Sequence, residues 1–396
     1  MLGRVTCAAT LIIVGSGCTV VSCPENMTCV LKPTNVPSAG TGGTSDAPDG
    51  GGDAGTLDDG GTIVDDGSNG SPDLPAGEWV NVTGGLAGKP SGCGNLDTVF
   101  LKPKSFELIA GILSQGLWSS PAGKTWKALG TGAGSATVTN GPLTIVFDPT
   151  DPNRFWEAGI YGVTGGLYTT TDGGTTFTAL NQTYSDSIAV DFTDPKRLRM
   201  LAGLHELQQA VFKSTDGGAT WANVGATLPK DRFCTVVLTL DATNYLVGCS
   251  GAKTGIFRTS DGAKKWLQVS DGGGALRPLV ASDGSIYWSS AANGQLVRST
   301  DAGQTWSEVM PANVLTTASP IELPDGRIAA LSREYLVVSA NHGLTWDYAS
   351  AKLPYLGSAG VVYSPTEKAF FIWRNDCGNA VLEDAVMRFD FDYETQ

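Results

Sequence analysis

Six copies of one eight-residue pattern are spaced along the chain between residues 119 and 346. The clearest copy is residues 214–221, with the sequence STDGGATW. The other copies are residues 119–126 (SSPAGKTW), 170–177 (TTDGGTTF), 259–266 (TSDGAKKW), 299–306 (STDAGQTW) and 339–346 (SANHGLTW). Their third positions, Pro121, Asp172, Asp216, Asp261, Asp301 and Asn341, lie 51, 44, 45, 40 and 40 residues apart. A repeat of that length is typical of the four-stranded blade of a β-propeller.

Each copy predicts a tight turn between two antiparallel strands. An Asp or Asn side chain can accept hydrogen bonds from backbone N–H groups two residues further on, and glycine supplies the positive φ that such a turn needs. The aromatic residue that ends each copy is expected to begin the next strand and to pack between blades. We therefore predict a structural, non-catalytic role for Asp172, Asp216, Asp261, Asp301 and Asn341.

The copies resemble the Asp-box (bacterial neuraminidase, BNR) repeats of sialidases, xyloglucanases, sortilin ectodomains and photosystem assembly factors. A second signature, in residues 147–154 (FDPTDPNR) and 191–197 (DFTDPKR), is similar to the inner-strand hairpin of the xyloglucanase, sortilin and assembly-factor branch. The resemblance extends over residues 78–393. It implies an all-β propeller whose repeated turns face away from the ligand.

The number of blades follows from the segments that flank the six copies. Strand-like runs at residues 360–363, 369–373 and 385–391 supply three strands of a further blade. The segment at residues 79–82 (WVNV) copies the strand that follows a repeat at residues 221–224 (WANV). We expect a single seven-bladed propeller in which residues 79–82 form the outer strand of the last blade beside residues 385–391. A six-bladed ring is the alternative.

The N-terminal part predicts export. In residues 1–18, Arg4 precedes an apolar stretch and Gly15, Ser16 and Gly17 lead to Cys18, a pattern that resembles a bacterial lipoprotein signal with lipidation at Cys18. Ordinary secretory cleavage is the alternative. A short Cys-containing segment follows at residues 19–32, and residues 33–77 have eight Asp but no Lys, Arg, Glu or aromatic residue. We expect that linker to be a disordered tether and residues 78–396 to form the propeller.

The cysteines predict structural disulfides in an oxidising compartment. Cys234 and Cys249 flank a predicted hairpin at about equal distances from its turn, and a bridge between Cys93 and Cys377 would join the two ends of the ring. Cys23 and Cys29 could close a small loop near the membrane. The two histidines, His205 and His342, belong to different blades, so we expect no metal and no cofactor.

Candidate ligand-binding residues lie in the loops on the face opposite the repeated turns. If the repeat joins the third and fourth strands of a blade, the loops between second and third strands and between blades gather on that face. Aromatic and charged side chains in such loops often form propeller sites. These residues are Tyr161, His205, Glu206, Asp231, Arg232, Arg277, Arg333, Glu334, Tyr335, Arg374 and Asp376.

Charge narrows the class of ligand. Of the net charge of −13, the linker carries −8, so the remainder is only mildly acidic at −5. No basic face predicts nucleic acid or anionic lipid, and a membrane contact is expected only through an N-terminal lipid anchor. We expect a cell-surface binding or assembly module for a carbohydrate or an extracytoplasmic protein.

A glycoside hydrolase of the sialidase or xyloglucanase type is the alternative, so enzymatic activity stays an open question. A sialidase needs three guanidinium groups around the substrate carboxylate and a Tyr nucleophile activated by Glu. The family's Phe/Tyr-Arg-Ile-Pro motif is missing, and its nearest fragment is LRPL at residues 276–279. The xyloglucanases resemble two facing propellers with one acid each, whereas one ring accounts for this chain.

Overall fold

The computed structural model describes residues 74–91, 96–161, 166–251, 254–289, 294–310, 316, 318–355, 358–374 and 381–395, together with the backbone of two short paired strands, β1 (Ile13–Val14) and β2 (Cys18–Thr19). Among these residues, no helix combines the length and the apolar character needed to cross a membrane.

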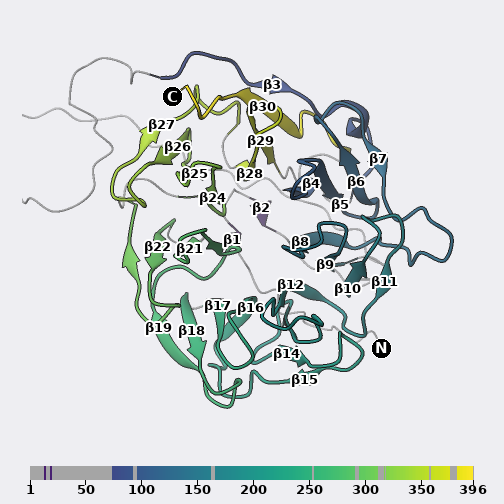
Figure 1. Cartoon of the computed structure of the whole chain (residues 1–396), viewed down its shortest axis with the longest axis vertical. Helices are drawn as coiled ribbons and strands as arrows, with labels where there is room; N and C mark the ends of the chain where they lie inside the picture. Colours follow the sequence, from purple (N-terminus) through teal and green to yellow (C-terminus); the bar gives the residue numbers. More distant parts are fainter. Residues whose placement is uncertain are drawn as a thin grey trace, which may run out of the picture.

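Seven four-stranded antiparallel sheets form a ring (Figure 1). The first, innermost strands are β4 (Leu96–Leu101), β8 (Gly141–Phe147), β12 (Ser185–Val190), β16 (Arg232–Thr239), β20 (Leu279–Val280), β24 (Ile321–Glu322) and β28 (Ser358–Ser364). The second strands are β5 (Leu108–Ile112), β9 (Phe155–Ile160), β13 (Met200–Leu204), β17 (Tyr245–Gly251), β21 (Ile286–Ser289), β25 (Ile328–Leu331) and β29 (Ala369–Arg374). The third strands are β6 (Gly116–Ser120), β10 (Gly166–Thr170), β14 (Val211–Ser214), β18 (Gly255–Thr259), β22 (Leu296–Ser299), β26 (Leu336–Ser339) and β30 (Val386–Asp390). The outer strands are β7 (Lys127–Ala128), β11 (Thr178–Ala179), β15 (Ala222–Asn223), β19 (Leu267–Ser270), β23 (Ser307–Glu308), β27 (Asp347–Tyr348) and β3 (Val80–Asn81). We number the blades 1 to 7 in this order.

The two ends of the propeller chain meet in blade 7, as the sequence predicts. β3 pairs with β30 through Val80 opposite Arg388 and Asn81 opposite Met387. Beyond β3, the N–H of Val82 donates to the carbonyl of Val386 at 2.9 Å, shortly before the single described 3-10 helix, η1 (Gly84–Leu86). The seven-bladed prediction is confirmed, and the six-bladed alternative is excluded.

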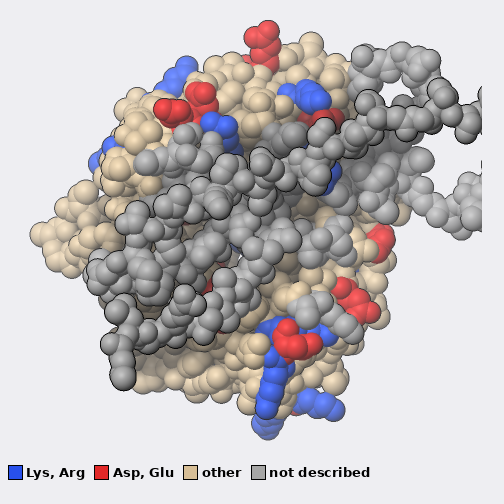
Figure 2. Space-filling model, turned by 180° about the vertical axis from the view of Figure 1, so that it is seen from behind, with Lys and Arg blue, Asp and Glu red and all other residues tan. Residues whose placement is uncertain are grey.

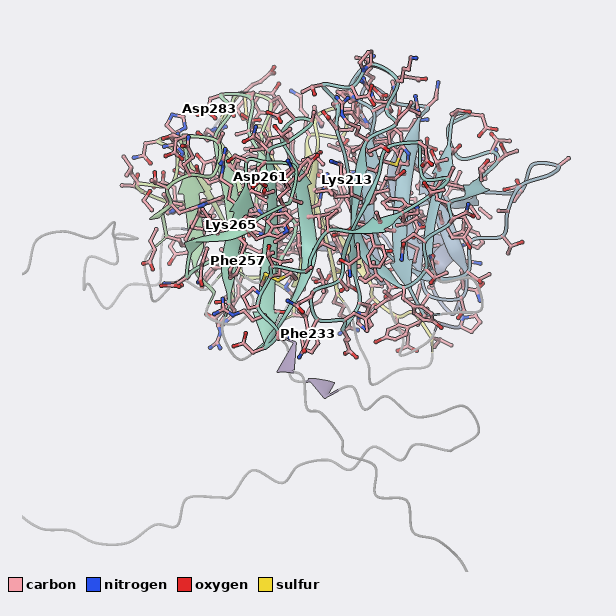
Figure 3. All side chains as sticks on the ribbon, turned by 90° about the horizontal axis from the view of Figure 1, so that it is seen from below. Lys213, Phe233, Phe257, Asp261, Lys265 and Asp283 are labelled. Carbon is pink, nitrogen blue, oxygen red and sulfur yellow. A yellow bond between two sulfur atoms is a disulfide. The ribbon has the colours of Figure 1, made fainter. Side chains whose placement is uncertain are left out.

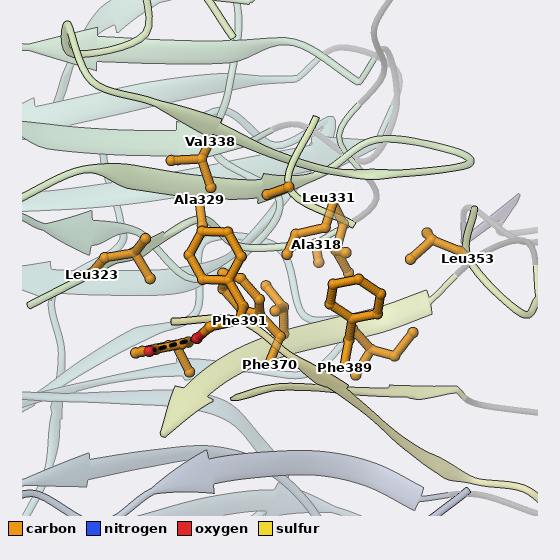
Figure 4. Packing of buried hydrophobic residues seen from close by; sticks show 14 of the residues in the cluster. Ala318, Leu323, Ala329, Leu331, Val338, Leu353, Phe370, Phe389 and Phe391 are labelled. Carbon is orange, nitrogen blue, oxygen red and sulfur yellow. Dashed lines mark hydrogen bonds between the residues drawn. The ribbon is translucent and has the colours of Figure 1, made fainter. Parts of the chain in front are cut away.

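The core is divided into seven clusters, each between two neighbouring blades. Between blades 6 and 7, Leu331 and Val338 pack near Phe370 and Phe389 (Figure 4). Between blades 7 and 1, the cluster joins Phe371 to residues that precede it by most of the chain, such as Leu86 and Leu96. Every blade therefore buries apolar side chains on both of its faces.

The repeated turns join the third and fourth strands, and the Asp or Asn side chain of a turn forms its hydrogen bonds within that turn. In the copy at residues 214–221, Oγ of Ser214 accepts a hydrogen bond from the N–H of Gly218 at 2.9 Å. Oδ1 of Asp216 accepts from the N–H of Thr220 at 2.9 Å, and the Thr220 hydroxyl donates to Oδ2. These hydrogen bonds lower the pKa of Asp216 to about 2. The main backbone donor lies four residues after the Asp, and the expectation of two residues was wrong.

The same arrangement recurs in the other turns. The main-chain N–H four residues on donates to the side chain at each of Asp172, Asp261, Asp301 and Asn341. Each of these side chains therefore holds a turn at the outer part of its blade.

The aromatic residues that follow the turns pack between blades as expected. Trp266 and Trp346 are buried. Nε1 of Trp266 donates to the carbonyl of Val224 in the connection from blade 3, and Nε1 of Trp346 donates to that of Val309 after blade 5, both at 2.9 Å. Each ring therefore ties its blade to the preceding one.

The second sequence signature forms a buried link between blades 2 and 3. Arg197 donates from Nε to Oδ2 of Asp148 at 2.9 Å and from a terminal nitrogen to Oδ1 at 3.1 Å. The bidentate Arg197 contact holds the pKa of Asp148 well below its usual range. The two copies of the signature thus bind each other across the seam.

One predicted disulfide is present in the described residues. Cys234 in β16 bonds to Cys249 in β17, which confirms that pair. The Cys23–Cys29 and Cys93–Cys377 pairs lie outside the described residues, as does the side chain of Cys18.

We predict that Ser214→Ala lowers the free energy of unfolding by about 1–3 kcal/mol, because the buried N–H of Gly218 loses its acceptor. Urea unfolding followed by tryptophan fluorescence measures the change. The matched control is Ser307→Ala on the exposed outer strand β23, which should stay within about 0.5 kcal/mol of the parent. Equal stability of the two variants would contradict a structural role for the turn hydroxyl.

Candidate ligand-binding site on the loop face

The antiparallel order of each blade places the second-to-third-strand loops and the connections between blades on one face. We call it the loop face; the repeated turns lie on the opposite face. Figure 3 shows the two edges: Asp261 of a repeated turn and Asp283 lie toward one edge, and Phe233 near the start of β16 lies toward the other. The C-terminal ends of β9 and β13 and the start of β12 therefore all lie at the loop face.

Four polar side chains meet on the loop face between blades 2 and 3. Nδ1 of His205 lies 2.8 Å from Oδ1 of Asp186. An ionised carboxylate only accepts hydrogen bonds, so the proton is on Nδ1 and Nε2 of a neutral ring is an acceptor. The hydroxyl of Tyr161 lies 3.2 Å from this Nε2, and Oε1 of Glu206 lies 3.7 Å from it. The sequence-predicted residues Tyr161, His205 and Glu206 are thus brought together.

Exposed apolar surface surrounds this polar group. Tyr161 is 44% exposed, Tyr184 is 54% exposed and Leu207 is 52% exposed. The N–H of His205 donates to the carbonyl of Tyr184 at 2.8 Å, so the connection that carries Tyr184 is fixed to the same loop. We call Tyr161, Tyr184, Asp186, His205, Glu206 and Leu207 the blade 2–3 site.

The backbone of the site is held in an uncommon conformation. Tyr161, Tyr184 and Glu206 have φ values of +60°, +52° and +51°. Non-glycine residues with positive φ carry a conformational cost and tend to occur where the surrounding structure enforces a functional geometry. The positions of these exposed side chains are therefore fixed by the fold.

A β-bulge explains how Asp186 reaches His205. The pairing of β12 with β13 shifts register between Ser185 and Ser187. A bulge re-aims the side chain of the extra residue, which here is Asp186. The inner strand of blade 1 has the same shift between Leu96 and Thr98, around Asp97.

Two acidic neighbours change the pKa of His205. Burial alone would lower its pKa, but the hydrogen bond to Asp186 and the negative charges of Asp186 and Glu206 together raise the pKa of His205 above its ordinary value. Protonation of the ring would change Nε2 from a hydrogen-bond acceptor to a donor.

A second polar group lies inside the neighbouring seam, between blades 1 and 2. Asn140 donates from Nδ2 to Oε2 of Glu157 at 3.3 Å and to the carbonyl of Gly166 at 3.2 Å. Burial raises the pKa of Glu157 to about 8, and the charge of Asp97 contributes to that rise. Burial also raises the pKa of Asp97, although a backbone hydrogen bond from Leu113 opposes it.

Two predicted arginines have separate surroundings. Arg232 donates to Oε1 of Gln268 in the outer strand of its own blade and forms an ion pair with Asp231 at 3.7 Å. Arg277 enters the space enclosed by the ring, where its guanidinium lies 5.0 Å from the ring centroid of Phe100 in blade 1. Arg277 touches solvent, yet burial by the surrounding protein lowers its pKa to about 10. These two guanidinium groups point in different directions.

The other predicted residues lie on blades 6 and 7. Glu334 pairs with Lys352 at 2.8 Å, and the ring of Tyr335 packs against Tyr348 with centroids 4.8 Å apart. Arg333 is exposed on the same loop. The guanidinium of Arg374 lies 5.3 Å from the ring centroid of Tyr355. Asp376 lies outside the described residues.

Sequence reasoning missed Tyr184 and Asp186, as well as the buried group formed by Asp97, Asn140 and Glu157. The available signal was an Asp followed by a hydroxyl residue near the start of an inner strand, as in SDS at residues 185–187 and LDT at residues 96–98. That pattern occurs at the bulge, but it does not identify the residue that the Asp contacts.

Comparisons with known proteins support the architecture. A model of the DUF6242 beta propeller domain matches residues 235–369, from blade 4 into blade 7. No curated protein matches the chain. Among solved structures, the fold is similar to the GH74 xyloglucanase from Xanthomonas campestris, with a TM-score of 0.54 and 18% identity over 76% of this chain and 53% of that one.

A second similar structure is the extracellular domain of a putative one component system from B. thetaiotaomicron. It has a TM-score of 0.54 and 10% identity over 80% of this chain and 40% of that one. A putative hybrid two component system of the same organism matches with a TM-score of 0.54 and 10% identity over 75% and 40% of the two chains. This chain thus spans about half of the xyloglucanase and two fifths of the sensor domains. At these identities the likeness shows the fold alone.

We predict that His205 titrates above pH 6.5 in the folded protein and that Asp186→Asn lowers this pKa. NMR titration of the ring proton measures it, and His205→Gln assigns the signal because the chain has two histidines. Since the folded-state pKa is raised, the stabilisation by protonated His205 is complete below the unfolded pKa of about 6.5 and is lost as the pH rises through the folded value.

Glu206→Gln is the control for this titration, because the longer distance of Glu206 predicts a smaller decrease. A pKa of His205 that Asp186→Asn leaves unchanged would contradict the proposed contact.

Proposed function

We propose that this protein is an exported propeller, attached to the cell envelope through a lipid on Cys18, which binds a carbohydrate at the blade 2–3 site. The observation that carries the proposal is the pair of exposed tyrosines, Tyr161 and Tyr184, beside the His205 and Glu206 side chains. A protein ligand presenting similar polar groups is the alternative within the binding class.

The chemistry of the site suits a sugar. The apolar faces of pyranose rings pack on exposed aromatic rings, and sugar hydroxyls donate to carboxylates and bond with imidazole and phenol groups. Glu206 offers acceptor oxygens, and His205 offers an acceptor or a donor depending on pH. Few polar groups at fixed positions beside apolar surface are the usual composition of a ligand site.

The repeated turns belong, in this proposal, to the Asp-box class. Their recurring hydrogen bond between the acid and the N–H four residues on supports that assignment. They lie on the face opposite the blade 2–3 site, which supports a scaffold role for Asp172, Asp216 and Asp301.

The structural similarities favour an extracytoplasmic ligand. One similar fold belongs to a xyloglucanase and another to an extracellular sensor domain. Both support a surface protein, and the xyloglucanase supports carbohydrate as the ligand class.

Charge is also consistent with a neutral or weakly polar ligand. Figure 2 shows acidic and basic side chains interspersed on the described surface of the face opposite to that seen in Figure 1. Nucleic-acid binding needs a continuous basic surface to contact phosphates, and the net charge of −13 opposes such contacts.

Glycoside hydrolysis is the second candidate, favoured by the similarity to the xyloglucanase. A sialidase-type site would require several guanidinium groups directed at one carboxylate. Arg232 is directed at Gln268, whereas Arg277 is directed at Phe100. This separation supports binding over sialidase chemistry.

We predict that Tyr161→Ala and Tyr184→Ala each weaken carbohydrate binding at least tenfold, about 1.4 kcal/mol, with little change in melting temperature. A glycan array probed with the full chain identifies the ligand, and calorimetry then measures the affinity of each variant. Exposed aromatic side chains contribute to binding but little to folding, so the affinity should fall while the melting temperature stays nearly unchanged.

The matched control is Leu344→Ala, which removes a side chain that is 66% exposed in a repeated turn on the opposite face. It should leave affinity unchanged. If Leu344→Ala lost binding while the two tyrosine variants kept the parent affinity, the ligand would bind on the face of the repeated turns, and the proposal would be wrong. Turnover of aryl glycosides that Tyr161→Phe abolishes would instead establish the hydrolase.

A further inference from the structure

Among the residues that the structure describes, three buried oxygen atoms in the seam between blades 1 and 2 have no hydrogen-bond partner. They are Oδ2 of Asp97, Oδ1 of Asn140 and Oε1 of Glu157. Asn140 and Glu157 are each 0% exposed. Leaving a buried acceptor without a donor is costly, and the cost is larger for charged groups. The seam therefore lacks a partner that would satisfy these atoms.

The three residues belong to one group. The hydrogen bonds from Nδ2 of Asn140 to Glu157 and to the carbonyl of Gly166 fix the orientation of the amide and leave its oxygen free. Asp97 lies close enough for its charge to act on Glu157. The oxygens of the group come from blade 1 and from two parts of blade 2.

Two glycines allow this polar group to lie close to the backbone of β8 and β9. Gly141 pairs with Ile160, and Gly159 pairs with Pro142, so the glycines are near each other on β8 and β9. A Cβ on Gly159 would lie 2.5 Å from Nδ2 of Asn140, and a Cβ on Gly141 would lie 3.0 Å from Oδ2 of Asp97. Ordinary side chains at these positions would collide with the polar group.

No cationic side chain balances the two carboxyl groups. Within the described ranges, neither Asp97 nor Glu157 forms an ion pair with Lys, Arg or His. A bound dication would favour the ionised forms of both acids and also coordinate the unpartnered oxygens.

We propose that Ca²⁺ binds in this seam, coordinated by Asp97 and Glu157 with the amide oxygen of Asn140 as a third ligand. An all-oxygen set of carboxylates and an amide carbonyl matches the preference of Ca²⁺. Ca²⁺ takes six to eight oxygens, so water or backbone carbonyls complete the coordination. Asp97 is partly exposed at the loop face, which gives the ion a route of entry.

The proposed ion departs from the expectation of no metal. No group of three or more His, Cys, Asp or Glu in the described part of the chain is placed to hold a metal. The seam instead combines two acids with an amide oxygen. The proposal does not rest on carbohydrate binding, because the seam is separate from the blade 2–3 site.

The test is calorimetric titration of the full chain with CaCl₂ after removal of bound ions with EDTA. We expect one saturable site and a higher melting temperature in Ca²⁺ than in EDTA. Glu157→Gln and Asp97→Asn should each weaken that binding at least tenfold and remove the Ca²⁺-dependent shift in melting temperature. Both substitutions keep the side-chain shape, and circular dichroism in EDTA verifies that each variant folds.

Asp347→Asn on the exposed outer strand β27 is the matched control and should bind Ca²⁺ like the parent chain. The acidic linker is intact in every variant, so any weak binding to it is common to all. Absence of a saturable site, or equal Ca²⁺ affinity in the parent, Glu157→Gln and Asp97→Asn, would overturn the proposal. If Glu157→Gln does not fold, Asp97→Asn decides the question, because Asp97 is partly exposed.

Discussion

Each blade of this protein is apolar on both faces, and that constraint determines the rest of the structure. A sheet with two apolar faces needs a neighbour on each side, so the blades continue until the last one meets the first. The pairing of β3 with β30 and the cluster that contains Leu86, Leu96 and Phe371 complete this closure. Residues more than 300 positions apart, such as Asn81 and Met387, thereby become strand neighbours.

Closure also gives the two faces of the ring different side-chain arrangements. The repeated turns use their polar side chains internally, as Asp216 does with Thr220, and so offer few groups to a ligand. On the loop face, register shifts at the start of the inner strands β12 and β4 contain Asp186 and Asp97. The same local irregularity therefore supplies one acid of the blade 2–3 site and one acid of the buried seam.

The sequence predicted those features that depend on local patterns. The spacing of the repeats set the blades, the likeness of residues 79–82 to residues 221–224 identified β3, and the hairpin predicted the Cys234–Cys249 bond. Tyr161, His205 and Glu206 were predicted because they are aromatic or charged residues in loops that the blade topology places on one face. Tyr184, Asp186 and Glu157 were not, since their roles depend on contacts with residues distant in the sequence, such as that of Asp186 with His205, which no local pattern encodes.

Native-state hydrogen exchange tests the closed ring most directly. The N–H of Val82 bonds across the junction to Val386, whereas Val247 lies in the centre of blade 4. If closure is part of one cooperative structure, both amides should exchange through global unfolding, with opening free energies that agree to within about 1 kcal/mol. An opening free energy for Val82 that is several kcal/mol lower would show that the ring opens locally at β3, and it would contradict closure as the constraint on which the structure depends.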